Sequence, residues 1–314
     1  MDMDLSLIIL LGAIGGGMFG AAIGALPAFI FTGFTVIAGT AVGFSGGEFD
    51  MLGTVAFGPV FGPHIAFAGG VAAAAYAKKA GLVEDAKDIG STMAGLANPI
   101  VLAIGGLFGL IGHVGQQLIA VTIGDFTDGI ALMVAISNII VRLVFGSGGP
   151  LGTLTTEAAQ RGRFSPGGDN VWVPFQEKLP QAATIGVAAG LISSWMVSIA
   201  WQTDEALAGV AIVLGFGISA ASLILLLFGL NGPVTHHMTL PAAVATFQML
   251  DAGMAVEGAM IIGVVFGALG ALLGEFFARL FLIHGDTFVD PPANAIWSAT
   301  TIAILLGMAV GAVL

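Results

Sequence analysis

The chain contains no cysteine, which excludes disulfide bonds, thiolate metal ligands and cysteine nucleophiles. Charged residues are also scarce: they make up 9% of the 314 residues, whereas hydrophobic residues make up 57%. A soluble domain carries roughly 25% charged residues, so this chain lacks the polar surface needed to face water all round. Its eight basic residues and net charge of −11 give no electrostatic support to nucleic-acid binding.

Long apolar runs are present instead, and they predict an all-α integral membrane protein. About twenty apolar residues cross the hydrocarbon core of a bilayer. The runs are continuous rather than alternating in segments of about ten residues, so a transmembrane barrel is not expected. The ten predicted spans are residues 5–24, 26–45, 54–77, 97–122, 129–146, 181–201, 206–225, 227–250, 258–283 and 294–314. No charged loop separates the seventh run from the eighth, so residues 225–237 either cross the membrane or form a re-entrant segment.

The basic residues predict the orientation, because Lys and Arg favour cytoplasmic loops. With ten spans and an outside N-terminus, every basic residue falls on or near the cytoplasmic side, as listed here by position: Lys78, Lys79, Lys87, Arg142, Arg161, Arg163, Lys178 and Arg279. The opposite loops carry acids and no bases, namely Glu48, Asp50, Asp125, Asp128, Asp204, Glu205 and Asp251. The first run follows Met1-Asp2-Met3-Asp4, which lacks the positive region of a cleavable signal peptide. We therefore expect a multi-pass protein of the cell membrane with both termini outside.

Two short similarities predict an internal duplication. Gly124-Asp125-Phe126-Thr127-Asp128 reappears as Gly285-Asp286-Thr287-Phe288-Val289-Asp290, and Gly62-Pro63-His64 resembles the segment Gly232–His237. The predicted units are a first five-helix repeat (1–146), a cytoplasmic linker (147–180) and a second five-helix repeat (181–314). An odd number of spans inverts the second repeat relative to the first. Inverted-topology repeats recur in secondary transporters, with the binding site near the midplane.

Gly-Pro breaks in the third and eighth runs are the most informative candidates for a site. Pro removes a backbone donor and Gly loosens the turn, so we expect a helix to break and restart with Pro near its first position. A restarted helix offers free N–H groups and a positive dipole end, which suits an anion. The predicted substrate-binding residues are Gly62, Pro63, His64, Asn231, Gly232, Thr235, His236 and His237. The alternative is an ordinary proline kink packed away from any pathway.

Ionisable residues in or beside the spans are candidates for ion or proton coupling, because such groups are rare in membranes and usually functional. They are His113, Glu275, Asp125, Asp128, Asp286 and Asp290. The alternative for Glu275 is a structural ion pair with Arg279, four positions later on the same helix face. The alternative for the aspartates is capping of helix starts. No metal site or cofactor is expected, since adjacent His236 and His237 project to different sides of a helix.

Glycine recurs every fourth residue in the first run, at Gly12, Gly16, Gly20 and Gly24. Such a face is nearly free of side chains and favours close helix contact, either within the protomer or between protomers of a homo-oligomer. The leading functional prediction is a transporter or channel for a small polar solute, with an anion as one candidate and H⁺ or Na⁺ as coupling ion. An intramembrane enzyme, or an ion-translocating or structural subunit of a membrane complex, is the alternative.

Overall fold

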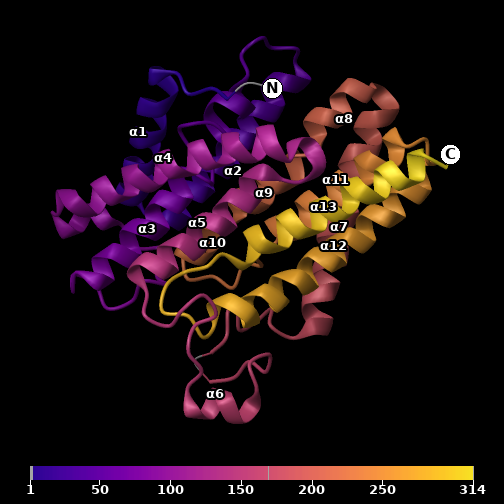
Figure 1. Ribbon diagram of the computed structural model, residues 1–314. Helices are drawn as coiled ribbons and strands as arrows, with labels where there is room; N and C mark the ends of the chain where they lie inside the picture. Colours follow the sequence, from indigo (N-terminus) through magenta and orange to yellow (C-terminus); the bar gives the residue numbers. More distant parts are fainter. Residues whose placement is uncertain (1–2, 169, 314) are drawn as a thin grey trace.

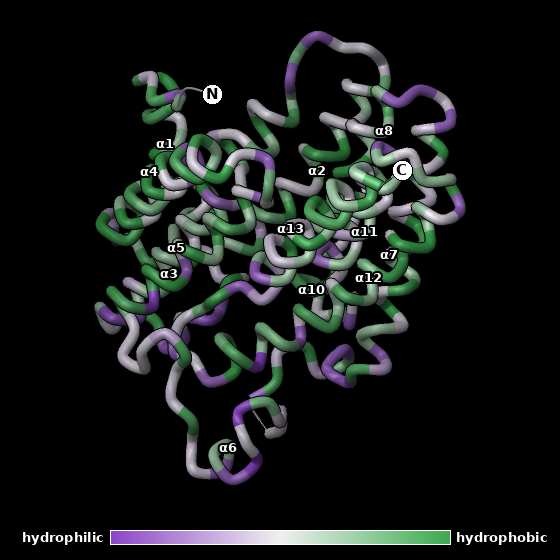
Figure 2. Tube along the Cα trace, turned by 45° about the vertical axis from the view of Figure 1, so that its right-hand side comes forward, coloured by the Kyte–Doolittle hydropathy of each residue, from purple (hydrophilic) through white to green (hydrophobic). Residues whose placement is uncertain are grey.

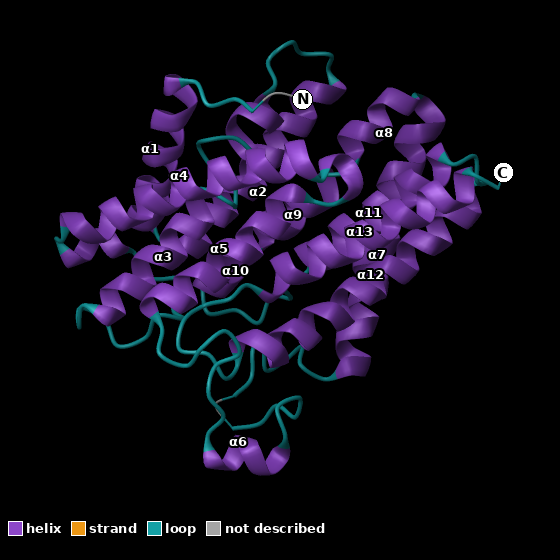
Figure 3. Cartoon of the chain, in the orientation of Figure 1, coloured by secondary structure: helices purple, strands orange, loops and turns teal. Residues whose placement is uncertain are grey.

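The computed structural model describes residues 3–168 and 170–313, and within these ranges it is helical with no named strand (Figure 3). The first half contains α1 (Leu7–Ile23), α2 (Ala25–Phe44), α3 (Ala66–Lys79), α4 (Pro99–Thr122) and α5 (Gly129–Phe145). The second half contains α7 (Leu179–Thr203), α8 (Glu205–Ala211), α9 (Leu214–Ser222), α10 (Ile224–Leu227), α11 (His236–Asp251), α12 (Val256–Phe277) and α13 (Pro291–Gly311). Short elements are η1 (Leu52–Ala56), η2 (Met93–Leu96), η3 (Gly124–Phe126), α6 (Thr156–Arg161) in the linker and η4 (Ala278–Leu282).

Six helical segments in the described chain are long and apolar enough to cross a membrane, fewer than the ten that the sequence predicted. They are α2, α4, α7, the combined segment Glu205–Leu227, the combined segment Val256–Leu282, and α13. The count differs because α1 and α5 have 17 residues each, and because the breaks leave α3 and α11 with 14 and 16. At 1.5 Å per residue, a 14-residue helix is only about 21 Å long.

Each half has the same internal packing. In the first half α1, α3 and α4 pack against one another, and in the second half α7, α11 and α12 do so. Glycine makes both contacts close, because a Cβ on Gly69 of α3 would lie 2.7 Å from backbone oxygens of Gly17 and Gly105, and one on Gly267 would lie 2.5 Å from the Gly186 oxygen. The predicted glycine face of α1 is used within the chain, since a Cβ on Gly16 would collide with the Pro59 carbonyl oxygen.

The two halves meet through counterpart helices, beginning with the second helix of each. A Cβ on Gly33 of α2 would lie 2.7 Å from the Gly217 oxygen of α9, and one on Gly217 would lie 3.3 Å from the Gly33 oxygen. Further along α2, a Cβ on Gly43 would lie 2.9 Å from Val210 of α8. Residue numbers therefore rise along α2 while they fall along α9 and α8, so these helices are antiparallel.

The fifth helices of the two halves are also antiparallel partners. Thr127, just before α5, hydrogen-bonds through its hydroxyl to that of Thr301 in the middle of α13 (2.7 Å). Asn138 in the middle of α5 accepts a hydrogen bond from the backbone N–H of Asp290, just before α13 (3.0 Å). Each of the helices α5 and α13 thus begins beside the middle of the other, so these two helices are antiparallel.

The basic residues gather at one end of the helix bundle. Lys79 Nζ donates to the Val144 oxygen (2.7 Å), Arg163 to the Leu280 oxygen (3.2 Å) and Arg279 to the Glu177 oxygen (2.9 Å). The linker helix α6 projects at this end, and both chain termini lie on the side away from it (Figure 1).

The outer faces of the helices expose large apolar side chains. Examples from four helices are Ile8, Leu118, Ile192 and Ile261. Hydrophobic colour covers the helices and hydrophilic colour gathers in the loops and around α6 (Figure 2). Extended apolar surface of this kind is unusual for a soluble monomer, so the surface is compatible with a membrane protein.

Candidate functional site

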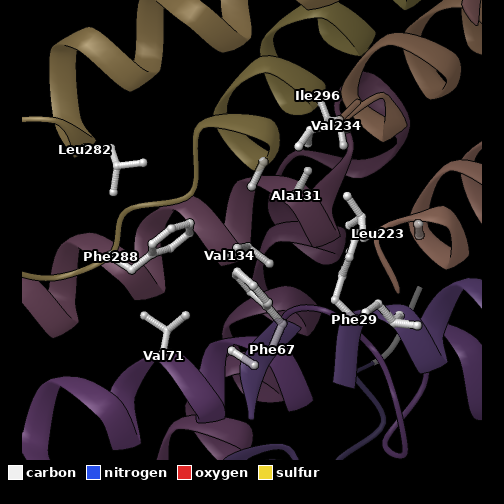
Figure 4. Packing of buried hydrophobic residues seen from close by; sticks show 14 of the residues in the cluster. Phe29, Phe67, Val71, Ala131, Val134, Leu223, Val234, Leu282, Phe288 and Ile296 are labelled. Atoms are coloured by element: carbon white, nitrogen blue, oxygen red, sulfur yellow. The ribbon is translucent and has the colours of Figure 1, made fainter. Parts of the chain in front are cut away.

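A cavity of about 590 Å³ lies between the two halves. Its wall includes Phe29 of α2 and Phe67 of α3 from the first half, and Ile296 of α13 from the second. Figure 4 shows these side chains converging with Val134 of α5 and Phe288 of the loop before α13. A concave, mostly apolar cavity with a few polar groups in its wall is typical of small-molecule binding sites.

Two carboxylates, one from each half, lie in the wall. Asp128 caps α5 by accepting a hydrogen bond from the Ala131 N–H (2.8 Å), and Asp290 caps α13 by accepting one from the Ala293 N–H (2.7 Å). Both side chains are half-buried. The alternative of capping is therefore confirmed for these two aspartates, and the caps also line the cavity.

Part of the linker forms another side of the cavity. Residues 172–175 line it, and the fully buried Gln176 fastens them to the chain before α11. The Gln176 side-chain amide donates to the Val234 oxygen (3.2 Å) and accepts from the Val234 N–H (3.0 Å). The segment predicted as a connector is thus also part of the cavity wall.

The Gly-Pro breaks are present in both halves, but the predicted position of proline in the new helix is wrong. The helices begin at Ala66 and His236, three residues after Pro63 and Pro233 in each case. In the first break residues 63–65 form a turn, in which the Gly62 oxygen accepts from the Ile65 N–H (2.8 Å), whereas residues 233–235 of the second break form no regular structure. Pro63 lies in the wall of the main cavity. The breaks therefore place chain irregularities beside the cavity, without placing proline at the first helical position.

The three break histidines occupy different surroundings. His236 lines the cavity, where its ring centroid lies 4.7 Å from that of Phe29. His237 is fully buried beside Trp172 (5.6 Å between ring centroids), and neither of its ring nitrogens has a hydrogen-bond partner. His64 is not part of the cavity wall. Its carbonyl oxygen lies against Gly112 of α4, and its ring lies beside Gly62.

The remaining predicted substrate residues lie away from the main cavity. Thr235 and Pro233 line a smaller cavity of about 240 Å³ on the other side of the second break. Asn231 is exposed, whereas Gly232 is buried against Leu225. The structure therefore brings Pro63 and His236 together at one cavity and separates the other predicted residues from it.

The predicted coupling residues outside the cavity are held locally. His113 Nε2 hydrogen-bonds to the Asp4 oxygen (2.8 Å), and Asp125 is exposed in the turn η3. Glu275 is buried and lies 3.4 Å from Arg279, which is the ion pair given above as the alternative. Burial alone would raise the pKa of Asp286, but hydrogen bonds from the Ser147 N–H (2.6 Å) and hydroxyl (2.8 Å), with the charge of Arg142, lower it below its ordinary value.

Two residues that the sequence did not single out for a site prove to be central. Arg142 is fully buried and donates to Thr287 Oγ1 (3.1 Å), to the Pro150 oxygen (3.1 Å) and to the carbonyl oxygens of Phe281 and Thr287. Gln176 holds the linker against the backbone of Val234 through two hydrogen bonds. The position of Arg142 inside an apolar run was a signal that could have been used, whereas nothing in the linker sequence distinguishes Gln176.

Comparison with protein families finds one match, to a model described as "Family of unknown function (DUF7973)", over residues 1–158 and again over residues 152–313. The two matches together cover almost the whole chain, and the chain belongs to this family. That one model matches both stretches supports the internal duplication, and the second match begins inside the predicted linker. Neither the curated proteins nor the solved structures contain a match.

Proposed function

We propose that this member of the family is a membrane transporter or channel for a small solute, with its site in the central cavity between two inverted halves. The observation that carries the proposal is the cavity of about 590 Å³ at the junction of the counterpart helices. Binding sites of secondary transporters with inverted repeats lie at this kind of junction. Because fold-level analogy alone does not establish function, the proposal is stated for this cavity and its residues.

We also propose that the second half is inverted relative to the first. When counterpart helices are antiparallel at their contact, the two-fold axis that relates them lies across the helices rather than along them. In a bilayer this axis would lie in the membrane plane. The antiparallel contacts of Gly33 with Gly217 and of Asn138 with Asp290 support this arrangement.

We further propose that the chain crosses the membrane ten times. The segments 52–79 and 228–251 would each cross as a broken unit, with a non-helical stretch continuing into α3 or α11. Non-helical backbone is tolerated at membrane depth only where protein or a water-filled cavity surrounds it. Pro63 and Val234, one from each break, line the main cavity, which supports this reading.

The proposed orientation places the basic end of the bundle in the cytoplasm. Lys79, Arg163 and Arg279 all hydrogen-bond at that end, and the chain termini lie on the other side (Figure 1). Both termini would then be outside, and the chain would cross the cell membrane ten times.

The enzyme alternative has less support from the side chains. A reaction centre needs a nucleophile, a base and a stabilising group within reach of one another. His236, Asp128 and Asp290 share the cavity wall, but each carboxylate caps a helix and His236 Nδ1 has no hydrogen-bond partner, so no base–carboxylate pair is formed there. His113 is bonded to Asp4 and Glu275 to Arg279, away from this wall.

Accessibility of the cavity tests the proposal directly. Because the chain has no cysteine, single cysteines can be introduced without a background. Val134 and Val141 are both buried on α5, but only Val134 lines the cavity. In reconstituted vesicles, Val134→Cys should react with a charged, membrane-impermeant methanethiosulfonate, and Val141→Cys should not. Equal protection of both cysteines would favour a solid structural subunit and overturn the transport proposal.

A further inference from the structure

The charges in the cavity wall have one sign. Asp128 and Asp290 contribute carboxylates, and no Lys or Arg of the described residues lines the cavity. Neither carboxylate lies within 4 Å of a basic side-chain nitrogen, since the ion pair between Glu275 and Arg279 is the one found in the described chain. A site with this lining disfavours the anion that the helix N-termini suggested from the sequence.

Each carboxylate has spare capacity for a partner. One oxygen of Asp128 and one of Asp290 accept the capping N–H groups of Ala131 and Ala293. The second oxygen of each receives no hydrogen bond from a side chain in the described ranges. Apolar surroundings favour the neutral form of a carboxylate that has no charged partner, and a cation in the cavity would stabilise the ionised form.

His236 provides an independent sign of a ligand. Its side chain is only 5% exposed, lies in the cavity wall, and leaves Nδ1 without a hydrogen-bond partner. Buried polar atoms are normally paired. A neutral imidazole nitrogen that is not protonated accepts a hydrogen bond, so a ligand that carries an N–H group would satisfy it.

Aromatic rings make up much of the rest of the wall: Phe29, Phe57, Phe67, Trp172, Phe175, Phe216 and Phe288. The faces of such rings attract organic cations and also pack against apolar groups. The volume of about 590 Å³ lies within the range of small-molecule sites, roughly 300–1,000 Å³.

We infer that the central cavity binds a protonated organic amine with an apolar body. The carboxylate of Asp128 or that of Asp290 pairs with its positive charge, His236 accepts an N–H group, and the aromatic wall holds the apolar part. This inference names the substrate class of the proposed transport site and rests on that proposal.

Three probes of similar shape and different charge test the inference by calorimetry on the purified full chain in detergent. They are 2-phenylethylammonium, neutral 2-phenylethanol and anionic phenylacetate. The wild-type chain should bind the ammonium at least about tenfold more tightly than the alcohol and should bind phenylacetate most weakly. Equal or tighter binding of the alcohol or of phenylacetate would overturn the inference.

The double variant Asp128→Asn and Asp290→Asn removes the two charges while keeping the caps, because Asn caps a helix about as well as Asp. Its affinity for 2-phenylethylammonium should fall at least about tenfold, and its affinity for 2-phenylethanol should change less than about threefold. The matched control is Asp125→Asn with Asp251→Asn, which changes two exposed acids outside the cavity wall and should leave both affinities unchanged. Retention of the ammonium affinity in the cavity variant would contradict the inference.

A ring variant provides a second test that does not depend on the aspartates. Phe67→Leu should weaken the ammonium about two- to fivefold, and more than the alcohol, because it removes a ring face. Equal weakening of both probes would contradict a role of the ring in selecting charge.

Flux separates this inference from the proposed function. If the ammonium binds as predicted but vesicles take up none of it, transport fails while the binding site stands. If Val134→Cys reacts with the charged thiol reagent as predicted but the ammonium does not bind, only the inference about charge fails.

Discussion

At the scale of single residues, glycine decides how closely the broken segments approach the helices beside them. The carbonyl oxygen of His64 lies against Gly112 of α4, and that of His237 lies against Gly270 of α12. His64 lies in the turn before α3, and His237 is the second residue of α11. Backbone at or beside a break can approach a neighbouring helix this closely only where the neighbour lacks a side chain.

We predict that Gly112→Ala destabilises the protein by about 1–3 kcal/mol, because the new methyl group would collide with backbone that is held in a tight turn. Thermal unfolding in detergent, followed by loss of the monodisperse peak, measures the effect. The control is Gly15→Ala on the exposed face of α1, where an added Cβ meets nothing within 4 Å. That change should be neutral or stabilising, since Ala favours a helix more than Gly. Equal effects of the two variants would show that the Gly112 contact is unimportant.

Arg142 is the second residue whose removal should be felt throughout the fold. Its guanidinium serves carbonyl oxygens of three segments that meet at the basic end of the bundle, at Pro150, Phe281 and Thr287. Arg142→Met would leave these buried acceptors without donors, and each costs about 1–3 kcal/mol. We expect a loss of about 3 kcal/mol or more in the same unfolding measurement. Arg161→Met removes an exposed arginine with one carbonyl partner and should change stability by less than about 0.5 kcal/mol. A small effect at Arg142 would mean that water replaces its hydrogen bonds.

At the scale of elements, the linker acts as a wall of the cavity because Gln176 pairs with the backbone of Val234 as a neighbouring strand would. We predict that Gln176→Leu releases linker residues 172–175 from the backbone of Val234. Loss of about 1.4 kcal/mol of hydrogen bonding corresponds to a tenfold change in an opening equilibrium. Exchange of the backbone amides in residues 232–235, which are those of Gly232, Val234 and Thr235, should therefore become about tenfold faster, and Val134→Cys should react faster with the thiol reagent.

The control for the linker variant is Gln160→Leu on the exposed face of α6, which should leave both rates unchanged. Unchanged exchange at residues 232–235 in Gln176→Leu would show that the linker is held by the apolar contacts of Trp172 and Phe175 instead.

The elements also show what the sequence could and could not predict. The apolar runs indicated the helical class, and the Gly-Pro pairs located both breaks, because length of hydrophobic run and loss of a backbone donor are local properties. The number of helices that are each long enough to cross a membrane is six rather than the ten predicted spans, since it depends on how many residues each break removes from α3 and α11. The turn formed by residues 63–65, just before α3, depends on packing against α4 rather than on the sequence of the break.

The site was also predicted only in part, because local sequence patterns identify single residues but not contacts between distant segments. His236 and the acidic turns were identified as candidates, and His236, Asp128 and Asp290 do line the cavity. His64 was predicted because it directly follows the first Gly-Pro break, and it lies outside the wall although its neighbour Pro63 lies in it. The pairing of Gln176 with Val234 joins residues 58 positions apart, and no local pattern encodes a contact of that range.

At the scale of the whole molecule, duplication gives a direct test of inversion. The C-terminal ends of α3 and α11 are counterparts, and Lys78 and Asp251 are exposed at these ends. If the axis lies in the membrane plane, counterparts lie on opposite faces. If the axis runs along the membrane normal, they lie on the same face.

We therefore predict that Lys78→Cys is labelled only from the cytoplasmic side and Asp251→Cys only from outside, when an impermeant maleimide is applied to intact cells and to inverted vesicles. Cysteines at Lys79 and Arg163 should be labelled with Lys78, because their side chains hydrogen-bond at the same end of the bundle, and one at Asp204 should be labelled with Asp251. Replacing one lysine changes the basic balance of the loops only slightly, so the orientation should be kept. Labelling of Lys78→Cys and Asp251→Cys from the same side would rule out the inverted repeat. It would also remove the reason for placing the cavity at the midplane, since Asp128 and Asp290 would then face the same side of the membrane.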